Sequence, residues 1–227
     1  MKMEQKYPKA LLLDFYGTLV EEDDISIQRI CKEVADASGV SPTEIGAFWS
    51  SVFSEMCMQS HSESFRLQKD IERSSLESVL KKYEVDLGPD DISQCLFDYW
   101  KRPQPLPEAM DVISRIRIPI CILSNIDNAE LNSALDYTGF AFEHIVTSED
   151  CRSYKPRAEM FEAALSKLDL DREDVLHIGD SVSSDVVGAQ KNGIRVMWIN
   201  RNKRTVDDSI RPDYVSDNLT AILDVLR

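Results

Sequence analysis

The sequence predicts an α/β protein that has a parallel sheet as its core and an inserted domain made of helices. Short aliphatic runs, typical of buried parallel strands, recur along the chain. They lie at Ala10–Leu13, Ile118–Leu123, His144–Thr147, Val175–Ile178 and Ile194–Ile199. Helical periodicity separates the later runs, and this alternation predicts a Rossmann-like sheet with helices on both faces. The segment between the first two runs breaks the alternation, because its apolar spacing is helical throughout.

The first aliphatic run ends in an acidic residue, Asp14, which is soon followed by Gly17-Thr18. A buried strand that opens into a turn in this way places Asp14 at the carboxyl end of the sheet. Open α/β proteins bind their ligands at that edge. An aspartate there can be a nucleophile, a metal ligand or a turn cap.

The inserted segment, residues 21–103, is expected to form four helices. Gly39 gives a stop signal for the first helix, and Ser41 followed by Glu44 gives a start signal for the second. Aromatic residues of the second helix, Trp49 among them, are interpreted as the internal core of the insertion, although one or two could face a site. Beside Asp14, the insertion would act as a lid that excludes water and selects substrates. The alternative is structural decoration.

The remaining residues, 1–20 and 104–227, are expected to form the core domain. Later helices of this domain are predicted from apolar spacing and from the stop signal Asn192-Gly193. They cover Ala129–Tyr137, Met160–Leu168, Asp185–Lys191 and Leu219–Leu226.

Composition excludes several classes of partner. The chain of 227 residues has 26 basic and 40 acidic residues, and its formal charge of −14 argues against nucleic acid or an anionic membrane. Its five cysteines form no C-x-x-C pair, which is typical of reduced thiols in a cytoplasmic protein. Met1–Pro8 is too polar for a signal peptide, and no apolar stretch reaches membrane-spanning length. We therefore expect a soluble cytoplasmic enzyme whose partner is a small, anionic molecule.

Polar residues follow the predicted strands at four places. These clusters are Asp14 with Thr18, Ser124-Asn125, Lys155-Pro156, and Gly179-Asp180-Ser181 with Asp185. Because the carboxyl ends of parallel strands meet at one edge of a sheet, we expect the four clusters to converge. Each has a structural reading of its own as a turn or a helix-start acid, but their joint occurrence favours chemistry.

A carboxylate at such an edge can attack phosphorus or carbon and form an ester that water later hydrolyses. Three aspartates with only Lys155 would carry a residual charge of −2, so a cation is required if phosphate is to approach. Oxygen ligands of this kind suit Mg²⁺. We interpret Asp14 and Asp180 as direct ligands, and Asp185 either as a ligand through water or as the residue that orients Lys155.

The four clusters, in this order, resemble the motifs of the haloacid dehalogenase superfamily of hydrolases along essentially the whole chain. The resemblance implies that superfamily's fold, with residues 21–103 as a mobile helical cap. It implies that Asp14 is the nucleophile and that the Thr18 hydroxyl positions it. Ser124, with Asn125 beside it, matches the second motif. The remaining matches are Lys155 as the third-motif amine, Asp180 and Asp185 as the acidic fourth motif, and the backbone carbonyl of Tyr16 as a further Mg²⁺ ligand.

Tyr16 departs from the phosphatases of that superfamily, which usually carry an acid–base aspartate there. Asp-x-Tyr-Gly-Thr resembles the 2-haloacid dehalogenase branch instead. Yet that branch has an early cap arginine, and here none occurs between Arg29 and Arg66. That branch also carries a tyrosine at the position where this chain has Phe161. Its fourth motif is Ser-Ser-Asn, where this chain has Gly179-Asp180-Ser181.

Three hypotheses follow. The first is a Mg²⁺-dependent hydrolase of a phosphorylated metabolite whose leaving group needs little protonation. The second is a 2-haloacid dehalogenase, and the third is a non-catalytic binding protein on a degenerate scaffold. His177 is interpreted as a packed or hydrogen-bonded core residue. The basic run Arg201–Arg204 is interpreted as a solvated loop, with contact to an anionic substrate as the alternative.

Overall fold

The computed structural model describes residues 7–227, so most of the polar amino-terminal segment lies outside the described residues. Its centre is a six-stranded sheet in the order β3-β2-β1-β4-β5-β6, and every neighbouring pair is parallel. The strands are β1 (Ala10–Leu13), β2 (Ile120–Ser124), β3 (His144–Thr147), β4 (Val175–Gly179), β5 (Arg195–Ile199) and β6 (Tyr214–Ser216). The α/β fold class and the first five strands are therefore confirmed.

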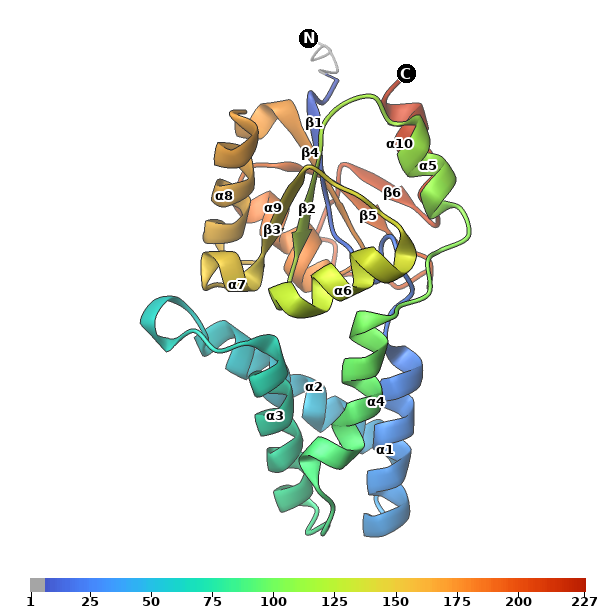
Figure 1. Ribbon diagram of the computed structural model, residues 1–227, viewed down its shortest axis with the longest axis vertical. Helices are drawn as coiled ribbons and strands as arrows, with labels where there is room; N and C mark the ends of the chain where they lie inside the picture. Colours follow the sequence, from blue (N-terminus) through green and yellow to red (C-terminus); the bar gives the residue numbers. More distant parts are fainter. Residues whose placement is uncertain (1–6) are drawn as a thin grey trace.

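Successive residues of a strand point to opposite faces of the sheet, and in the inner strands both faces are buried. Leu11 and Leu13 of β1 belong to one hydrophobic cluster, and Ala10 and Leu12 belong to the other. Helices cover both faces (Figure 1). On one side lie α5 (Ala109–Arg115), α6 (Asn128–Thr138) and α10 (Ala221–Val225), and on the other lie α8 (Ala158–Leu168) and α9 (Val187–Lys191).

The inserted segment forms four helices that stand apart from the sheet, below the carboxyl ends of its strands (Figure 1). Gly39 ends the first helix in a left-handed conformation with φ = 76°, and the Ser41 hydroxyl accepts the Glu44 N–H of the second. Both signals act as the sequence predicts. The helices are α1 (Asp24–Ser38), α2 (Pro42–Gln59), α3 (Gln68–Lys82) and α4 (Pro89–Lys101), with the 3₁₀ turn η1 (Ser62–Ser64) between α2 and α3.

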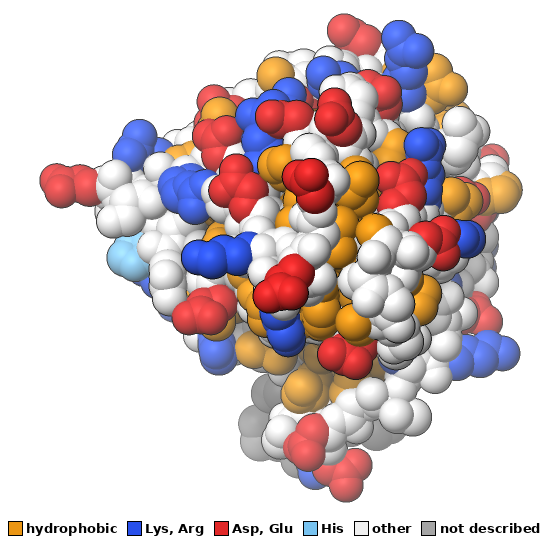
Figure 2. All heavy atoms as spheres, turned by 90° about the horizontal axis from the view of Figure 1, so that it is seen from below, with side chains coloured by type: hydrophobic (Ala, Val, Ile, Leu, Met, Phe, Trp, Pro, Cys, Tyr) orange, Lys and Arg blue, Asp and Glu red, His pale blue; other side chains and the backbone are white. Residues whose placement is uncertain are grey.

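The helical insertion is tied to the core by hydrogen bonds near the start of α3. The Asp127 carboxylate, at the start of α6, accepts the backbone N–H groups of Gln68 and Lys69 at 2.8 and 3.0 Å. The Tyr154 hydroxyl donates to the carbonyl of Arg66 at 2.8 Å. These contacts join α3 to loops that follow the sheet. Acidic and basic side chains are intermixed on the face of the insertion seen in Figure 2, with hydrophobic side chains between them.

Strand β6 and helix α5 are not among the predicted elements, and two of the predicted helices have other bounds. A helix was predicted to start at Asp185, but Asp185 lies inside a π-helical turn, η3 (Val182–Val186), and α9 begins only after it. The last helix is also shorter than predicted, because α10 covers Ala221–Val225. The short elements α7 (Ser148–Cys151) and η2 (Arg172–Asp174) complete the fold. All five cysteines are free, and no helix in the described part of the chain has the length and apolarity to cross a membrane.

Candidate active site

Asp14 lies at the carboxyl end of β1, where the chain turns sharply on the side of the sheet that faces the helical insertion. Its backbone N–H donates to the carbonyl of Ile178 at 2.9 Å, which continues the ladder between β1 and β4. Gly17 has φ = 80°, and a Cβ atom there would lie 2.6 Å from the Asp180 carboxylate. Glycine therefore allows the turn and the close approach to Asp180. Thr18 donates to the Asp14 carboxylate at 3.4 Å.

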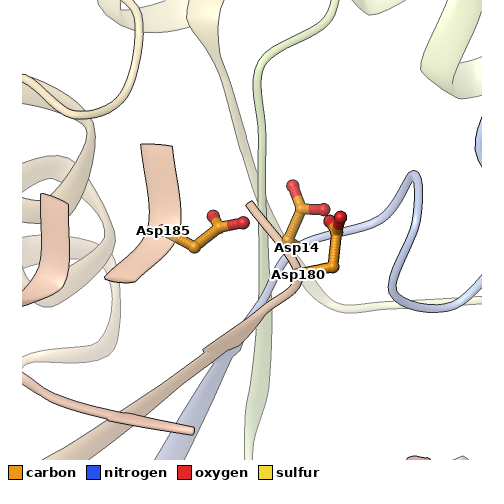
Figure 3. A group of neighbouring side chains, drawn as sticks. All are labelled: Asp14, Asp180 and Asp185. Atoms are coloured by element: carbon orange, nitrogen blue, oxygen red, sulfur yellow. The ribbon is translucent and has the colours of Figure 1, made fainter. Parts of the chain in front are cut away.

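Asp14, Asp180 and Asp185 converge at one place, and each offers a carboxylate oxygen within 4.8 Å of the other two (Figure 3). All three are at least nine-tenths buried. The π-helical turn directs Asp185 inward, where it accepts the N–H of Ser181 at 3.0 Å. A Cβ atom at Gly179 would lie 2.3 Å from the Asp185 carboxyl, so this packing also requires glycine.

Lys155 bridges two of the carboxylates. Its Nζ donates to Asp14 Oδ1 at 2.7 Å and to Asp185 Oδ1 at 2.6 Å, and its side chain is 1% exposed. Asn125 positions Lys155 through the backbone, because its amide accepts the Lys155 N–H at 2.7 Å and donates to the Lys155 carbonyl at 3.1 Å. Ser124 is buried at the end of β2. His177 Nε2 lies 2.9 Å from Asp185 Oδ1, which agrees with a hydrogen-bonded core histidine.

Burial and mutual repulsion disturb the acid–base equilibria of the cluster. Burial raises the pKa of Asp14 to about 7, with Lys155 opposing and Asp185 adding to the shift. The pKa of Asp180 rises to about 9, because of burial, a hydrogen bond with Glu22 and the neighbouring carboxylates. Burial would also raise the pKa of Asp185, but the charge of Lys155 and the bond from His177 outweigh it and hold that pKa well below its usual range. The side chains alone therefore lack the positive charge to keep all three carboxylates ionised.

The three side chains of this cluster offer carboxylate oxygens as ligand atoms. The backbone carbonyl of Tyr16, two residues after Asp14, is a further oxygen. Mg²⁺ prefers such hard oxygen ligands and keeps some of its waters. The chemistry of the donor set therefore fits a divalent cation.

Tyr16 cannot act as the missing acid–base group near neutral pH. Its hydroxyl donates to the carbonyl of Trp100 at 2.5 Å, and burial raises its pKa well above 10. The hydrogen bond also ties the turn after Asp14 to the end of α4.

The structure corrects one interpretation of the sequence. Arg204, taken as part of a solvated loop, donates to the Asp180 carbonyl at 2.7 Å and lies 3.3 Å from its carboxylate. Arg201 of the same run pairs with Glu108 at 2.8 Å. The two arginines line a cavity of about 260 Å³ that reaches Asp180. The only signal for this contact in the sequence is the basic run, and its fold-back depends on the loop after β5.

Comparison with known proteins agrees with this architecture. The family model described as a haloacid dehalogenase-like hydrolase matches residues 8–193. The chain therefore belongs to the haloacid dehalogenase-like hydrolases, as its motifs predict. It is 25% identical to (S)-2-haloacid dehalogenase of Pseudomonas sp. (strain YL), over 96% of this chain and 94% of that protein. It is 32% identical to pyrimidine 5'-nucleotidase YjjG of Escherichia coli (strain K12), over 51% and 53%.

Solved structures align with nearly the whole length of the chain. L-2-haloacid dehalogenase RSc1362 superposes with a TM-score of 0.82 at 18% identity, over 97% of this chain and 99% of that one. The magnesium-bound putative hydrolase YfnB from Bacillus subtilis gives a TM-score of 0.74 at 20% identity, over 98% and 100%. At these identities the likeness concerns the fold.

Proposed function

We propose that this hydrolase depends on Mg²⁺ and acts on a small phosphorylated metabolite through Asp14 as its nucleophile. The observation that carries the proposal is the third carboxylate, Asp180, packed against Asp14 and Asp185 with one lysine among them. Displacement of a halide from carbon needs no such acid. A reaction at phosphate does, if the acid helps to hold a cation.

Charge decides between the two reactions. With Lys155 protonated and the Arg204 guanidinium 3.3 Å from the Asp180 carboxylate, three ionised aspartates still leave a net charge of −1, which would repel a phosphate group. We propose Asp14, Asp180 and the carbonyl of Tyr16 as ligands of Mg²⁺, and Asp185 as a ligand through water or as the residue that orients Lys155. When bound, the ion would neutralise this charge and polarise the phosphoryl oxygens.

The residues of this chain then have distinct tasks. The Asp14 carboxylate attacks phosphorus, and the bond from phosphorus to the leaving oxygen breaks as the acyl phosphate forms. Thr18 and Lys155 hold the carboxylate in position for this attack, and the Lys155 charge also stabilises the phosphoryl oxygens. Water then cleaves the phosphorus–oxygen bond, which returns Asp14 as a carboxylate and releases phosphate. Ser124 and Asn125, the latter through its bonds to Lys155, support the phosphoryl site.

The leaving group must depart with little help from a proton donor. The Tyr16 hydroxyl donates to the Trp100 carbonyl and its pKa is raised, so it is too weak an acid to assist the leaving oxygen effectively at neutral pH. A positioned general acid is worth about 10²–10⁴ in rate, and an ordinary alkoxide would lose that factor. Acyl phosphates, phosphoric anhydrides and esters of acidified alcohols are the substrates that suit this site.

We also propose that residues 21–103 act as a cap over a core made of residues 1–20 and 104–227. The four helices stand at the carboxyl edge of the sheet, and the bonds between Asp127 and α3 fix one end of them there. A cap in this place would exclude water from the aspartyl phosphate. Reduced, unpaired cysteines support a cytoplasmic location.

Dehalogenation is the second candidate. The Asp-x-Tyr-Gly-Thr motif and the full-length similarity to (S)-2-haloacid dehalogenases favour it. A 2-haloacid, however, brings a carboxylate that needs a cation, and the α1–α2 segment that follows Arg29 contributes no arginine up to Arg66. A non-catalytic binding role is less favoured, because the bonds among Asp14, Lys155 and Asp185 are intact.

The test is a substrate panel assayed with Mg²⁺ and with EDTA. Acetyl phosphate, pyrophosphate, p-nitrophenyl phosphate and 2-chloropropionate are the probes, and phosphate and halide release are both measured. We expect phosphate release that EDTA abolishes. Halide release that persists in EDTA, without phosphate release under either condition, would establish the second candidate instead.

A further inference from the structure

A second cavity lies within the helical cap, away from the aspartate cluster. Its volume is about 190 Å³, and all four helices α1–α4 contribute to its lining. The lining residues that matter here are two acids, three aromatic residues and one amide: Asp23, Glu72, Trp49, Phe53, Trp100 and Gln68.

The cavity lies at the end of the cap that faces the core. Asp23 directly precedes α1, Gln68 begins α3, and Trp100 is in the last turn of α4. These are the helix ends nearest to the sheet (Figure 1). The Trp100 carbonyl accepts the hydroxyl of Tyr16, two residues from the nucleophile. The cavity therefore lies in the part of the cap next to the turn that follows Asp14.

Hydrogen-bond acceptors with no cation among the lining residues face the cavity, beside the Ser50 hydroxyl and the Gln68 amide, which can also donate. Asp23 accepts the indole N–H of Trp100 at 2.8 Å, and the Gln68 amide oxygen is buried without a hydrogen-bond partner among residues 7–227. Glu72 is 5% exposed and forms no ion pair with any described residue. Within residues 7–227, no lysine, arginine or histidine lines the cavity. A ligand that fits must bring a positive charge or hydrogen-bond donors.

The aromatic residues point to the same ligand. Trp49, Phe53 and Trp100 line the cavity beside the acids, and the indole N–H of Trp49 is fixed by a bond to the Ser75 hydroxyl at 2.9 Å. Aromatic faces next to carboxylates attract alkylammonium groups, because the ring quadrupole and the negative charge act together. When Asp23 and Glu72 are ionised, they would repel a carboxylate or a second phosphate.

We propose that this cavity binds the organic ammonium group of a substrate whose phosphoryl group reaches Asp14. This inference rests on the proposed function for its phosphoryl half, while the ammonium site itself can be tested alone. The two halves are consistent, since an ammonium group close to the ester oxygen makes the departing alcohol more acidic. That substrate would need less protonation than a neutral alkyl ester, in agreement with Tyr16 at the acid–base position.

The experiment compares two probes of equal shape, choline and its neutral carbon analogue 3,3-dimethyl-1-butanol. Binding is followed by intrinsic fluorescence, because two of the three tryptophans, Trp49 and Trp100, line the cavity. The Asp14→Asn variant is used in addition to the unmodified protein, so that binding is measured without turnover. We expect choline to bind at least about tenfold more tightly than the analogue.

Matched variants then locate the site. Binding is measured at about pH 9, above the pKa of about 8 that burial gives Glu72, so that this carboxylate is ionised. Glu72→Gln keeps the shape of the side chain and removes its charge, so choline should bind about tenfold more weakly. Glu77→Gln, on an exposed position of the same helix, should bind choline as the unmodified protein does. Asp23→Asn gives a second test if Glu72→Gln fails to fold.

Equal affinity for the two probes, no saturable signal with choline, or equal losses in the Glu72 and Glu77 variants would overturn the ammonium site. Choline binding in a protein that releases no phosphate from any probe would keep the site and reject the proposed hydrolysis. Phosphate release without choline binding would do the reverse. The two proposals can therefore fail separately.

Discussion

Replacing Glu72 by glutamine should make the protein more stable at alkaline pH and remove part of the pH dependence of its stability. Burial raises the pKa of Glu72 from 4.5 to about 8, with the charge of Asp23 adding to the shift and a bond from Trp49 opposing it. The folded protein thus holds this proton more tightly than the unfolded chain. Its contribution is fully present below pH 4.5 and is lost as the pH rises through about 8.

The size of the effect follows from linkage. Between about pH 5.5 and about pH 8.5, the free energy of unfolding of the unmodified protein should fall by roughly 3 kcal/mol relative to Glu72→Gln. This is an upper value, because a bound cation or solvent entering the cavity would reduce the shift. Asp23 and Cys57, the titratable groups that interact with Glu72, are present in both the protein and the variant, so the comparison isolates Glu72.

The assay is urea unfolding of both proteins at the two pH values, without divalent cations or amines in the buffer. Glu77→Gln is the control, since that exposed side chain should leave the pH dependence unchanged. A constant difference between the unmodified protein and Glu72→Gln at both pH values would refute the reasoning, because it would mean that Glu72 titrates as an ordinary exposed acid.

Three further predictions concern the aspartate cluster and Tyr16. Asp14→Asn should lower turnover by on the order of 10⁴-fold or more while thermal unfolding stays cooperative, and retained turnover would reject the nucleophile. Asp180→Asn should weaken Mg²⁺ binding at least about tenfold by calorimetry, because it removes one of few charged ligands; unchanged affinity would place the metal elsewhere. Tyr16→Asp should raise hydrolysis of alkyl phosphomonoesters on the order of 10²-fold, because it supplies the missing acid–base group. No gain in a variant that still binds Mg²⁺ would contradict the account of the leaving group.

The core of the fold could be predicted because its signals are local. Each inner strand is a short aliphatic run, which is the pattern typical of parallel strands that are buried on both faces. Strand β6 was missed because its three residues are half exposed or exposed and show no such run. The π-helical turn was missed because an acid such as Asp185 is common at the start of an ordinary helix, and nothing in the sequence marks the wider turn over Val182–Val186.

The convergence of the aspartates was also predictable, since parallel strands bring their carboxyl ends to one edge. Contacts made by loops and by the cap were not. Arg204 reaches Asp180 only because the loop after β5 folds back, and Asp127 meets α3 across 59 residues of sequence. The helix that carries Glu72 was predicted, but the direction that Glu72 faces depends on how four helices pack together.

The most direct test of the account is a search for the covalent intermediate on Asp14. The protein is mixed with acetyl phosphate and Mg²⁺, quenched in acid, digested and analysed by mass spectrometry. The account predicts that the peptide containing Asp14 gains the mass of one phosphoryl group, and that neither Asp14→Asn nor a sample with EDTA shows this gain. A phosphoryl group on another residue, or steady phosphate release with no modified Asp14 at any quench time, would contradict it.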